Sequence, residues 1–360
     1  MKLAVLSGGG DCPGINAVLR AVVRAARNLF DWPVIGVRDG FEGLLDPPRL
    51  VELGPVELVN ALTRGGTILG ASNRINPFAF ASDGVHREDR SAEVIRNIKD
   101  AGIDVLIVIG GDGTLLIASK LADLGVKVVG IPKTIDNDLE ATGVTFGFDT
   151  AVATATDAID KLQTTAESHH RVMYLQVMGR HAGWIAASSG IAGGAHVILI
   201  PEIPFEPRFV ARKIERRAEA GEGYTIVVVA EGAVERGGEA VYVEEKPRFG
   251  APRLGGVAER VAAKVFEICP REYRVTVLGH LQRGGSPNPH DRILCTRFGV
   301  AAVRAVAEER FGTMVALVKH RLELVTLKEA VGREKLVPPD GELVETARAV
   351  GVSFGDKEAR

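Results

Sequence analysis

Three polar side chains between residues 131 and 138 are suited to chemistry on a hydroxyl group. Asp136 and Asp138 lie two positions apart, and Thr134 lies two positions before them. In an extended chain all three would face the same side. A carboxylate placed there could accept a proton from a substrate hydroxyl while the other groups bind it. The same composition also fits an Asp/Asn-rich turn whose side chains bond to their own backbone.

The glycine-rich stretch at residues 110–114 favours the chemical interpretation. Glycines let backbone N–H groups approach a phosphate closely, and the N-terminus of a following helix attracts negative charge. Asp112 lies among these glycines and could hold Mg²⁺ beside phosphate oxygens. The two stretches together predict a phosphoryl-transfer site.

Buried strands are expected to deliver these residues. The apolar runs at 104–109 and 126–130 end directly before the two stretches. In open α/β sheets, ligands bind outside the carboxyl ends of the strands. A further strand at 2–7 leads into the glycine-rich residues 8–14 and a helix at 16–29. This is not a dinucleotide-binding fingerprint, because Pro13 holds the third glycine position, and no P-loop motif occurs.

Alternating strands and helices continue beyond residue 150, which predicts a second α/β sheet. Some of its expected strands end in polar groups, as before Met178-Gly179-Arg180 and before Glu231. His280 and Arg283 lie in a glycine-rich turn that could bind an anion. The charged tail from Glu329, with Pro338-Pro339, is expected to lie on the surface. The expected strands of this part are 172–177, 196–200, 224–230 and 274–279, and the expected helices are 148–165, 184–191 and 206–220. A further strand, at 33–37, is expected in the first part of the chain.

Length and composition indicate an ordinary globular protein of two domains. The chain has 360 residues, 46% of them hydrophobic and 25% charged, with a formal net charge of −2. This balance argues against a general affinity for nucleic acid or anionic membranes, and neither a membrane span nor a targeting segment is visible. The three cysteines lack metal-ligand spacing, so a cytoplasmic location is expected. Cys12 lies near a helix start, which could lower its pKa, but it is expected to be a plain loop cysteine.

The motifs, taken in order, resemble the phosphofructokinase family. Gly-Gly-Asp-Gly-Thr also occurs in NAD kinases and lipid kinases, whereas the remaining motifs are much more specific to the phosphofructokinase family. The resemblance extends over residues 9–285, most of the chain. It is carried by residues 9–14 with Asn16, 110–114, 133–138, 178–180 and 278–285.

This resemblance implies two similar α/β domains, each a three-layer sandwich with a mostly parallel sheet, and an active site in the cleft between them. Residues 1–145 plus 282–332 would bind ATP and Mg²⁺. Residues 146–281 plus 333–360 would bind the sugar phosphate. The family also implies a homo-oligomer, either a tetramer or a dimer.

The resemblance assigns roles to individual residues. Asp136 would be the proton acceptor, Arg180 would stabilise the transferring phosphoryl group, and Asp112 would hold Mg²⁺. Arg171 and Arg274 would reach the 6-phosphate from a neighbouring subunit. The implied nucleotide-binding residues are Gly10, Arg74, Gly111, Asp112, Gly113 and Thr114. The implied substrate-binding residues are Thr134, Asp136, Asp138, Arg171, Met178, Gly179, Arg180, Glu231, Arg274, His280 and Arg283.

The implied reaction transfers the γ-phosphoryl group of ATP to the 1-hydroxyl of fructose 6-phosphate, giving fructose 1,6-bisphosphate in glycolysis. Position 113 favours ATP, because pyrophosphate-using relatives carry Asp where this chain has Gly113. Lys133 points the other way, because those relatives carry Lys there too. A pyrophosphate-dependent enzyme, a kinase for another phosphorylated acceptor and a regulatory relative without catalysis are the alternatives.

Overall fold

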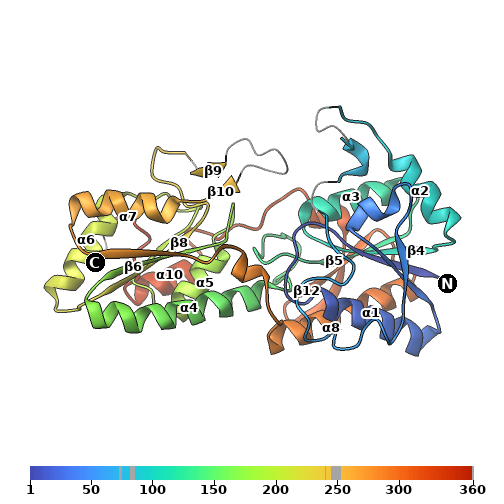
Figure 1. Ribbon diagram of the computed structural model, residues 1–360, viewed down its shortest axis with the longest axis horizontal. Helices are drawn as coiled ribbons and strands as arrows, with labels where there is room; N and C mark the ends of the chain where they lie inside the picture. Colours follow the sequence, from blue (N-terminus) through green and yellow to red (C-terminus); the bar gives the residue numbers. More distant parts are fainter. Residues whose placement is uncertain (73–74, 82–85, 240, 245–252, 359–360) are drawn as a thin grey trace. The chain divides into compact units, whose positions relative to one another are not determined.

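The computed structural model describes residues 1–72, 75–81, 86–239, 241–244 and 253–358 (Figure 1). The chain forms two compact units, each built from two separate segments. Unit 1 comprises Met1–Thr150 and Arg283–Glu334, and unit 2 comprises Ala151–Gln282 and Lys335–Arg360. The divisions expected from the sequence fall within a few residues of these, and the ligand assigned to each domain stays a prediction. None of the helices in the described ranges is long and apolar enough to cross a membrane.

Unit 1 is built around a seven-stranded sheet in the order β13-β12-β5-β4-β1-β2-β3. Its five central strands pair in parallel, while β3 and β13 are antiparallel edge strands. The apolar runs form the buried centre, as the sequence predicts. The strands are β1 (Leu3–Ser7), β2 (Val34–Val37), β3 (Leu50–Leu53), β4 (Val105–Gly110), β5 (Val128–Pro132), β12 (Thr313–Val318) and β13 (Arg321–Thr326).

Helices cover both faces of this sheet (Figure 1). One face packs against α2 (Ser91–Asp100), α3 (Asp112–Asp123) and α9 (Leu327–Ala330) through a shared apolar core. The other face carries α1 (Ile15–Phe30) and α8 (Pro289–Ala307), which pack against each other. Their approach needs a glycine, because a Cβ at Gly299 would lie 2.6 Å from the Cβ of Ala21. Two short 3₁₀ helices, η1 (Gly40–Leu44) and η2 (Pro77–Ala79), complete the unit.

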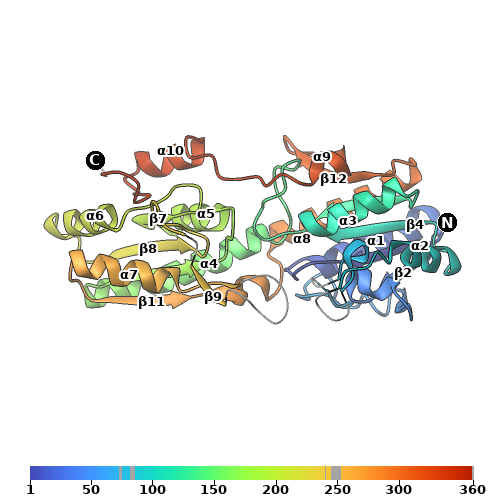
Figure 2. The same cartoon turned by 90° about the horizontal axis from the view of Figure 1, so that it is seen from above.

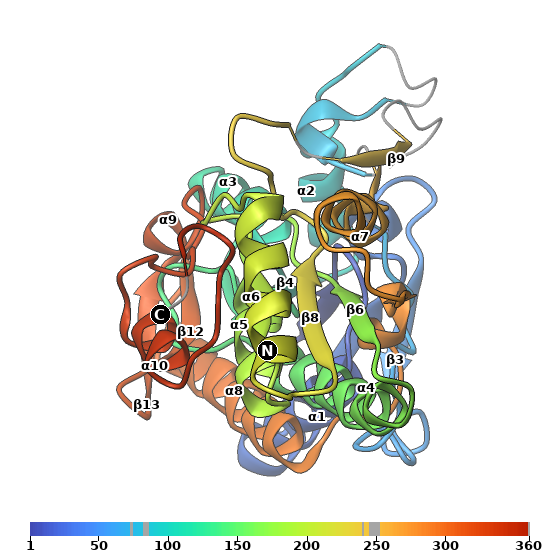
Figure 3. The ribbon, with the colours of Figure 1, turned by 90° about the vertical axis from the view of Figure 1, so that its left-hand side faces the viewer.

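Unit 2 has a smaller sheet of four parallel strands in the order β11-β6-β8-β7. In Figure 3, which faces this unit, β6 and β8 run alongside α6. The helices α6 and α7 share one apolar core with the sheet, and α5 packs on β7 and β8. The strands are β6 (Val172–Val177), β7 (Val197–Leu199), β8 (Thr225–Ala230) and β11 (Tyr273–Val277), with a hairpin of β9 (Tyr242–Glu244) and β10 (Arg253–Leu254). The helices are α4 (Phe148–His169), α5 (Trp184–Ala192), α6 (Pro207–Glu219), α7 (Val257–Ile268), α10 (Glu342–Ala349) and the 3₁₀ helix η3 (Gly279–Arg283).

The C-terminal tail corrects one expectation. It does not simply lie on the surface. The tail forms α10 (Figure 2), and the side chains of Val337, Val344 and Phe354 are buried. Ser353 also forms a parallel bridge with Val197 at the edge of the sheet. The tail is rich in charged residues but also contains a few spaced apolar side chains that become buried. Its overall composition therefore wrongly predicted a surface location. The main prediction, two α/β units with mostly parallel sheets, is confirmed.

Candidate active site

Unit 1 contains a cavity of about 420 Å³ at the carboxyl ends of β1, β4 and β5. This is the edge of the sheet at which the sequence places the phosphoryl-transfer site. The cavity brings together most of the residues predicted for unit 1, although their roles stay a prediction. The predicted residues that line it are Gly10, Gly111, Asp112, Gly113, Thr114, Lys133, Thr134, Asp136, Asp138 and Arg283.

The two glycine-rich loops of the cavity are packed together around Thr114. A Cβ at Gly8 would lie 2.7 Å from Cγ2 of Thr114, and a Cβ at Gly110 would lie 2.3 Å from its Cβ. The backbone N–H of Gly8 also donates to the carbonyl of Ile109 at 2.9 Å. These glycines therefore serve close packing of the loops, and the access to a phosphate expected from the sequence stays a prediction.

The N-terminus of α3 faces the cavity and can attract an anion. The helix begins at Asp112, and its N-cap residue Gly111 offers no side-chain acceptor to the first N–H groups. Gly113 is exposed, and a Cβ built there would meet no atom within 4 Å. Space for a ligand beside this turn is therefore open.

Asp112 is the predicted Mg²⁺ ligand, and its carboxylate lines the cavity. Its Oδ1 accepts a hydrogen bond of 2.7 Å from the backbone N–H of Gly332, which orients the carboxylate. Mg²⁺ usually takes one or two carboxylates together with substrate phosphate oxygens, so one oriented carboxylate beside a phosphate site fits it. No group of three or more His, Cys, Asp or Glu side chains able to hold a metal occurs among the described residues. The donor set thus fits a metal that arrives with a phosphate.

The segment after β5 alternates between the interior and the cavity. Thr134, Asp136 and Asp138 are half-buried and line the cavity, whereas the odd-numbered residues between them are buried. The common side expected from their spacing is therefore present. The chain is not fully extended, because Asn137 has a φ of 53°. The turn interpretation also holds in part, since Oγ1 of Thr134 accepts from the N–H of Asp136 at 3.1 Å.

Thr145 holds this segment in place from behind. Its hydroxyl donates to the carbonyl of Thr134 at 2.6 Å, and its N–H donates to Oδ1 of Asn137 at 3.1 Å. Buried side-chain hydrogen bonds of this kind restrict the backbone. The segment that carries the cavity-lining carboxylates is therefore held by hydrogen bonds to a buried segment behind it.

Two cations adjoin the first glycine loop. Lys133 is 4% exposed, and its ammonium donates to the carbonyl of Gly10 at 2.6 Å. Burial lowers the pKa of Lys133, while the carboxylates of Asp136 and Asp138 partly oppose that effect. Nη1 of Arg283 donates to the carbonyl of Asp11 at 3.3 Å. The cavity thus combines cations for a polyanion with carboxylates for a metal and a hydroxyl.

Cys12 is buried in this region and is not the activated thiol that its position near a helix start could suggest. It is 0% exposed, and burial raises its pKa to about 12. The effect of burial outweighs the nearby Lys133 cation, which acts in the opposite direction. The expectation of a plain cysteine without a lowered pKa agrees with this burial.

In unit 2, predicted sugar-binding residues follow the carboxyl ends of two neighbouring strands. Met178, Gly179 and Arg180 follow β6, and Glu231 follows β8. The two loops are fastened together, because the N–H of Gly232 donates to the carbonyl of Gly179 at 3.0 Å. A Cβ at Gly232 would lie 1.9 Å from the carbonyl oxygen of Arg180, so only glycine permits this contact.

The predicted 6-phosphate residues of unit 2 are not all brought together. Arg171 and Arg274 each contact Oε1 of Glu272 at 2.7 Å, near the amino ends of β6 and β11. His280 lies in η3, beyond the carboxyl end of β11. The two arginines thus lie apart from His280, and their expected contribution to a neighbouring subunit stays a prediction. Arg74 lies outside the described residues.

Several residues of the site were missed from the sequence. Gln282 is 0% exposed, and its Oε1 accepts from the N–H of Met178 at 3.4 Å. Its place between His280 and Arg283 was the available signal. The cavity in unit 1 is also lined by residues outside the motifs found in the sequence. These are Phe41, Ile75, Asn76 and Ile117.

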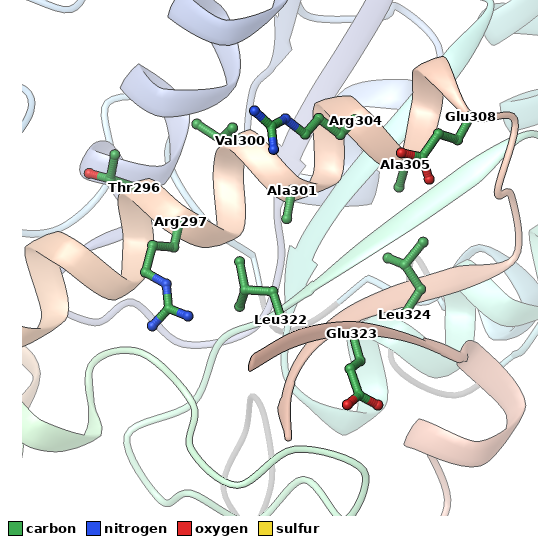
Figure 4. A pocket seen from close by; sticks show the side chains of 10 residues that line it. All are labelled: Thr296, Arg297, Val300, Ala301, Arg304, Ala305, Glu308, Leu322, Glu323 and Leu324. Atoms are coloured by element: carbon green, nitrogen blue, oxygen red, sulfur yellow. The ribbon is translucent and has the colours of Figure 1, made fainter. Parts of the chain in front are cut away.

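A second cavity in unit 1, of about 470 Å³, lies between α8 and β13 (Figure 4). It is lined by apolar side chains such as Val300 and Leu322 and by charged ones such as Arg304 and Glu323. None of the predicted site residues reaches it. We assign it no part in the chemistry.

Comparison with known proteins gives concordant results. The phosphofructokinase family model matches residues 2–306. The chain is 50% identical over 356 residues to a Chloroflexus aurantiacus protein named ATP-dependent 6-phosphofructokinase, covering 99% of this chain and 98% of that one. It is 52% identical over 343 residues to the Amycolatopsis methanolica protein named pyrophosphate–fructose 6-phosphate 1-phosphotransferase, covering 94% and 97%.

The fold agrees with a solved structure. Phosphofructokinase from Saccharomyces cerevisiae matches with a TM-score of 0.77 and 30% identity over 99% of this chain. The present chain spans 47% of that longer one, or about half its length. Motifs, cavity and fold thus converge, and the chain belongs to the phosphofructokinase family.

Proposed function

We propose that this chain is an ATP-dependent 6-phosphofructokinase that phosphorylates the 1-hydroxyl of fructose 6-phosphate. The observation that carries the proposal is one cavity that joins an uncapped helix N-terminus to a row of half-buried carboxylates. The first feature suits the phosphates of a donor, and the second suits the hydroxyl of an acceptor. Phosphoryl transfer depends on alignment and charge neutralisation more than on covalent chemistry by the protein.

Within this cavity the residues take distinct roles. The backbone around Gly10 and the start of α3 bind the donor phosphates, and Asp112 holds Mg²⁺. When bound, Mg²⁺ supplies charge neutralisation at the phosphate oxygens. Asp136 accepts the proton of the attacking hydroxyl, while Thr134 and Asp138 orient that hydroxyl. Lys133 and Arg283 add positive potential to the same cavity.

Residues of unit 2 bind the sugar phosphate in this proposal. Arg180 stabilises the transferring phosphoryl group, and Met178, Gly179 and Glu231 contact the sugar. His280 of unit 2 and Arg283, the first residue of the second segment of unit 1, bind its 6-phosphate. Arg171 and Arg274 bind the 6-phosphate held by a neighbouring subunit, so the working enzyme is a homo-oligomer, a tetramer or a dimer. Its proposed location is the cytoplasm.

Overall identity does not decide the donor, because the relatives named for ATP and for pyrophosphate are 50% and 52% identical to this chain. The open space at Gly113 supports ATP, since nothing there obstructs a nucleotide α-phosphate. Lys133 supports pyrophosphate as the second candidate, because its cation lines the cavity. Its ammonium is already bonded to Gly10, which weakens that case.

A coupled assay for fructose 1,6-bisphosphate tests the proposal. The purified chain is given fructose 6-phosphate and Mg²⁺ with either ATP or pyrophosphate. We expect a higher kcat/KM for the donor ATP. A higher value for pyrophosphate would transfer the proposal to the second candidate. Absence of product with both donors would refute the proposed function.

A further inference from the structure

Asp291, on α8, is a fully buried carboxylate outside the cavity. It is 0% exposed and accepts three hydrogen bonds. Its Oδ1 accepts from the N–H of Gly147 at 3.0 Å. Its Oδ2 accepts from the N–H and the hydroxyl of Thr150 at 2.9 and 2.5 Å. A carboxylate is the only side chain of this size with two acceptor oxygens and no donor, so it suits three converging donors.

The residues that Asp291 holds are wedged against the candidate site. Gly147 has a φ of 91°, and a Cβ there would lie 2.8 Å from Sγ of Cys12 and 3.3 Å from Cγ2 of Ile135. Gly147 thus separates the first glycine loop from the segment that carries Asp136. The backbone of Gly147 fills this space without a side chain. Any shift of that backbone would therefore alter the packing behind the glycine loop and behind the segment that carries Asp136.

The chain just before Gly147 is bonded to the cavity wall. Phe146 forms a parallel bridge with Lys133, and the hydroxyl of Thr145 donates to the carbonyl of Thr134. Residues 145–147 therefore form a layer between Asp291 and the cavity-lining residues 133–138. Asp291 is the only fully buried charged side chain in the described part of the chain.

A plain helix cap would not need this arrangement. An asparagine or serine at the start of α4 could satisfy its first N–H groups at lower desolvation cost than a buried carboxylate. Asp291 instead belongs to another helix, lies about 140 residues along the chain, and bonds to Gly147 before α4 begins. Asn288 extends the junction, since its N–H donates to the Thr150 hydroxyl at 3.1 Å.

We propose that Asp291 is a positioning residue for the phosphoryl-transfer reaction, acting through residues 145–147 on the proton acceptor Asp136. The inference rests on the proposed function. Without its hydrogen bonds to Gly147 and Thr150, the layer behind the cavity loosens, and Asp136 loses its alignment with the substrate hydroxyl. Small misalignments of a reacting group lower turnover strongly while leaving ground-state binding nearly intact.

A double-mutant cycle between Asp291→Asn and Asp136→Asn tests this. We expect Asp291→Asn alone to lower kcat about tenfold, with each KM changed by less than about twofold. In the Asp136→Asn background the same substitution should lower kcat by less than about twofold, because the group it positions is already absent. A merely structural role would lower activity by the same factor in both backgrounds. Such additive losses, or a loss expressed only in KM, would overturn the proposal.

Asp356→Asn is the matched control. It makes the same chemical change in unit 2, where the Asp356 carboxylate accepts two bonds from Arg348 at 3.0 and 2.8 Å. Its kcat should stay within about twofold of wild type. If Asp291→Asn fails to fold, Thr150→Val removes one of the three hydrogen bonds to Asp291, together with the acceptor of the Asn288 N–H, and should show a smaller kcat loss with the same non-additivity. Wild-type protein without kinase activity would refute the proposed function, whereas an active enzyme with an additive cycle would refute this inference alone.

Discussion

The ammonium of Lys133 and the carbonyl oxygen of Gly10 are joined by a partly buried hydrogen bond of 2.6 Å. This bond ties the end of β5 to the first glycine loop. We expect Lys133→Met, which keeps the length of the side chain, to lower kcat by about 10- to 100-fold through displacement of the loop. The loss should be similar with every donor that supports turnover. A loss restricted to pyrophosphate would show that the ammonium contacts that donor directly.

Gly113→Asp tests the choice of donor. The position is unobstructed, so the new carboxylate can be accommodated, and its charge in the first turn of α3 should not destabilise the fold. We expect kcat/KM for ATP to fall by at least about tenfold through repulsion of the α-phosphate, and far less for pyrophosphate.

Gly113→Ala is the control for this substitution, because it adds only a methyl group to open space. It should keep the ATP rate close to that of wild type. Equal losses with ATP and pyrophosphate in Gly113→Asp would mean that position 113 does not discriminate between donors.

Replacing the proposed base should abolish most of the chemistry. Asp136→Asn keeps the shape but cannot accept the proton, so we expect kcat to fall by roughly 10²–10⁴. Steady-state kinetics should show a smaller change in KM. Asp138→Asn, two residues further along the same row, should instead affect KM more than kcat. Near-normal turnover of Asp136→Asn would rule out its role as base.

Sharing of the active site between subunits can be tested by mixing. Arg171→Ala and Asp136→Asn remove residues proposed to serve one site from two different chains. In randomly mixed oligomers about one quarter of such sites would carry both native residues, so activity should reappear. The unmixed variants at equal total concentration are the control. Verified mixed oligomers without restored activity would contradict sharing.

The thiols should be unreactive in the folded protein. Cys12, Cys269 and Cys295 are buried, and burial raises the pKa of each, that of Cys12 to about 12. We expect no labelling by a thiol reagent at pH 8 until the protein unfolds, and three labelled thiols afterwards. Unfolded thiols ionise near their ordinary pKa of 9.0, so the free energy of unfolding should fall as pH rises from about 9 towards 12. Native labelling at pH 8 would contradict the burial.

Features encoded by local spacing could be predicted from the sequence. The apolar runs at 104–109 and 126–130 predicted two neighbouring strands. The spacing of Thr134, Asp136 and Asp138 predicted that their side chains share one side of the chain. These depend only on the period of a strand and on where a strand ends.

Features that depend on contacts between distant segments could not be predicted from the sequence. Nothing in the local sequence shows that Gly232 lies against the Arg180 carbonyl, or that Asp291 bonds to Gly147. The tail was misjudged because its burial depends on an apolar partner elsewhere in unit 2. Such contacts form only once the whole fold brings remote residues together.

The division of each unit into two chain segments affects the order in which the protein can fold during synthesis. All four strands of the unit 2 sheet have been translated by Val277, whereas β12, the neighbour of β5 in unit 1, begins at Thr313. The sheet nearer the N-terminus is therefore the later one to be completed on the ribosome. Until β12 emerges, β5 pairs only with β4, and its other edge is an open template for association with other chains.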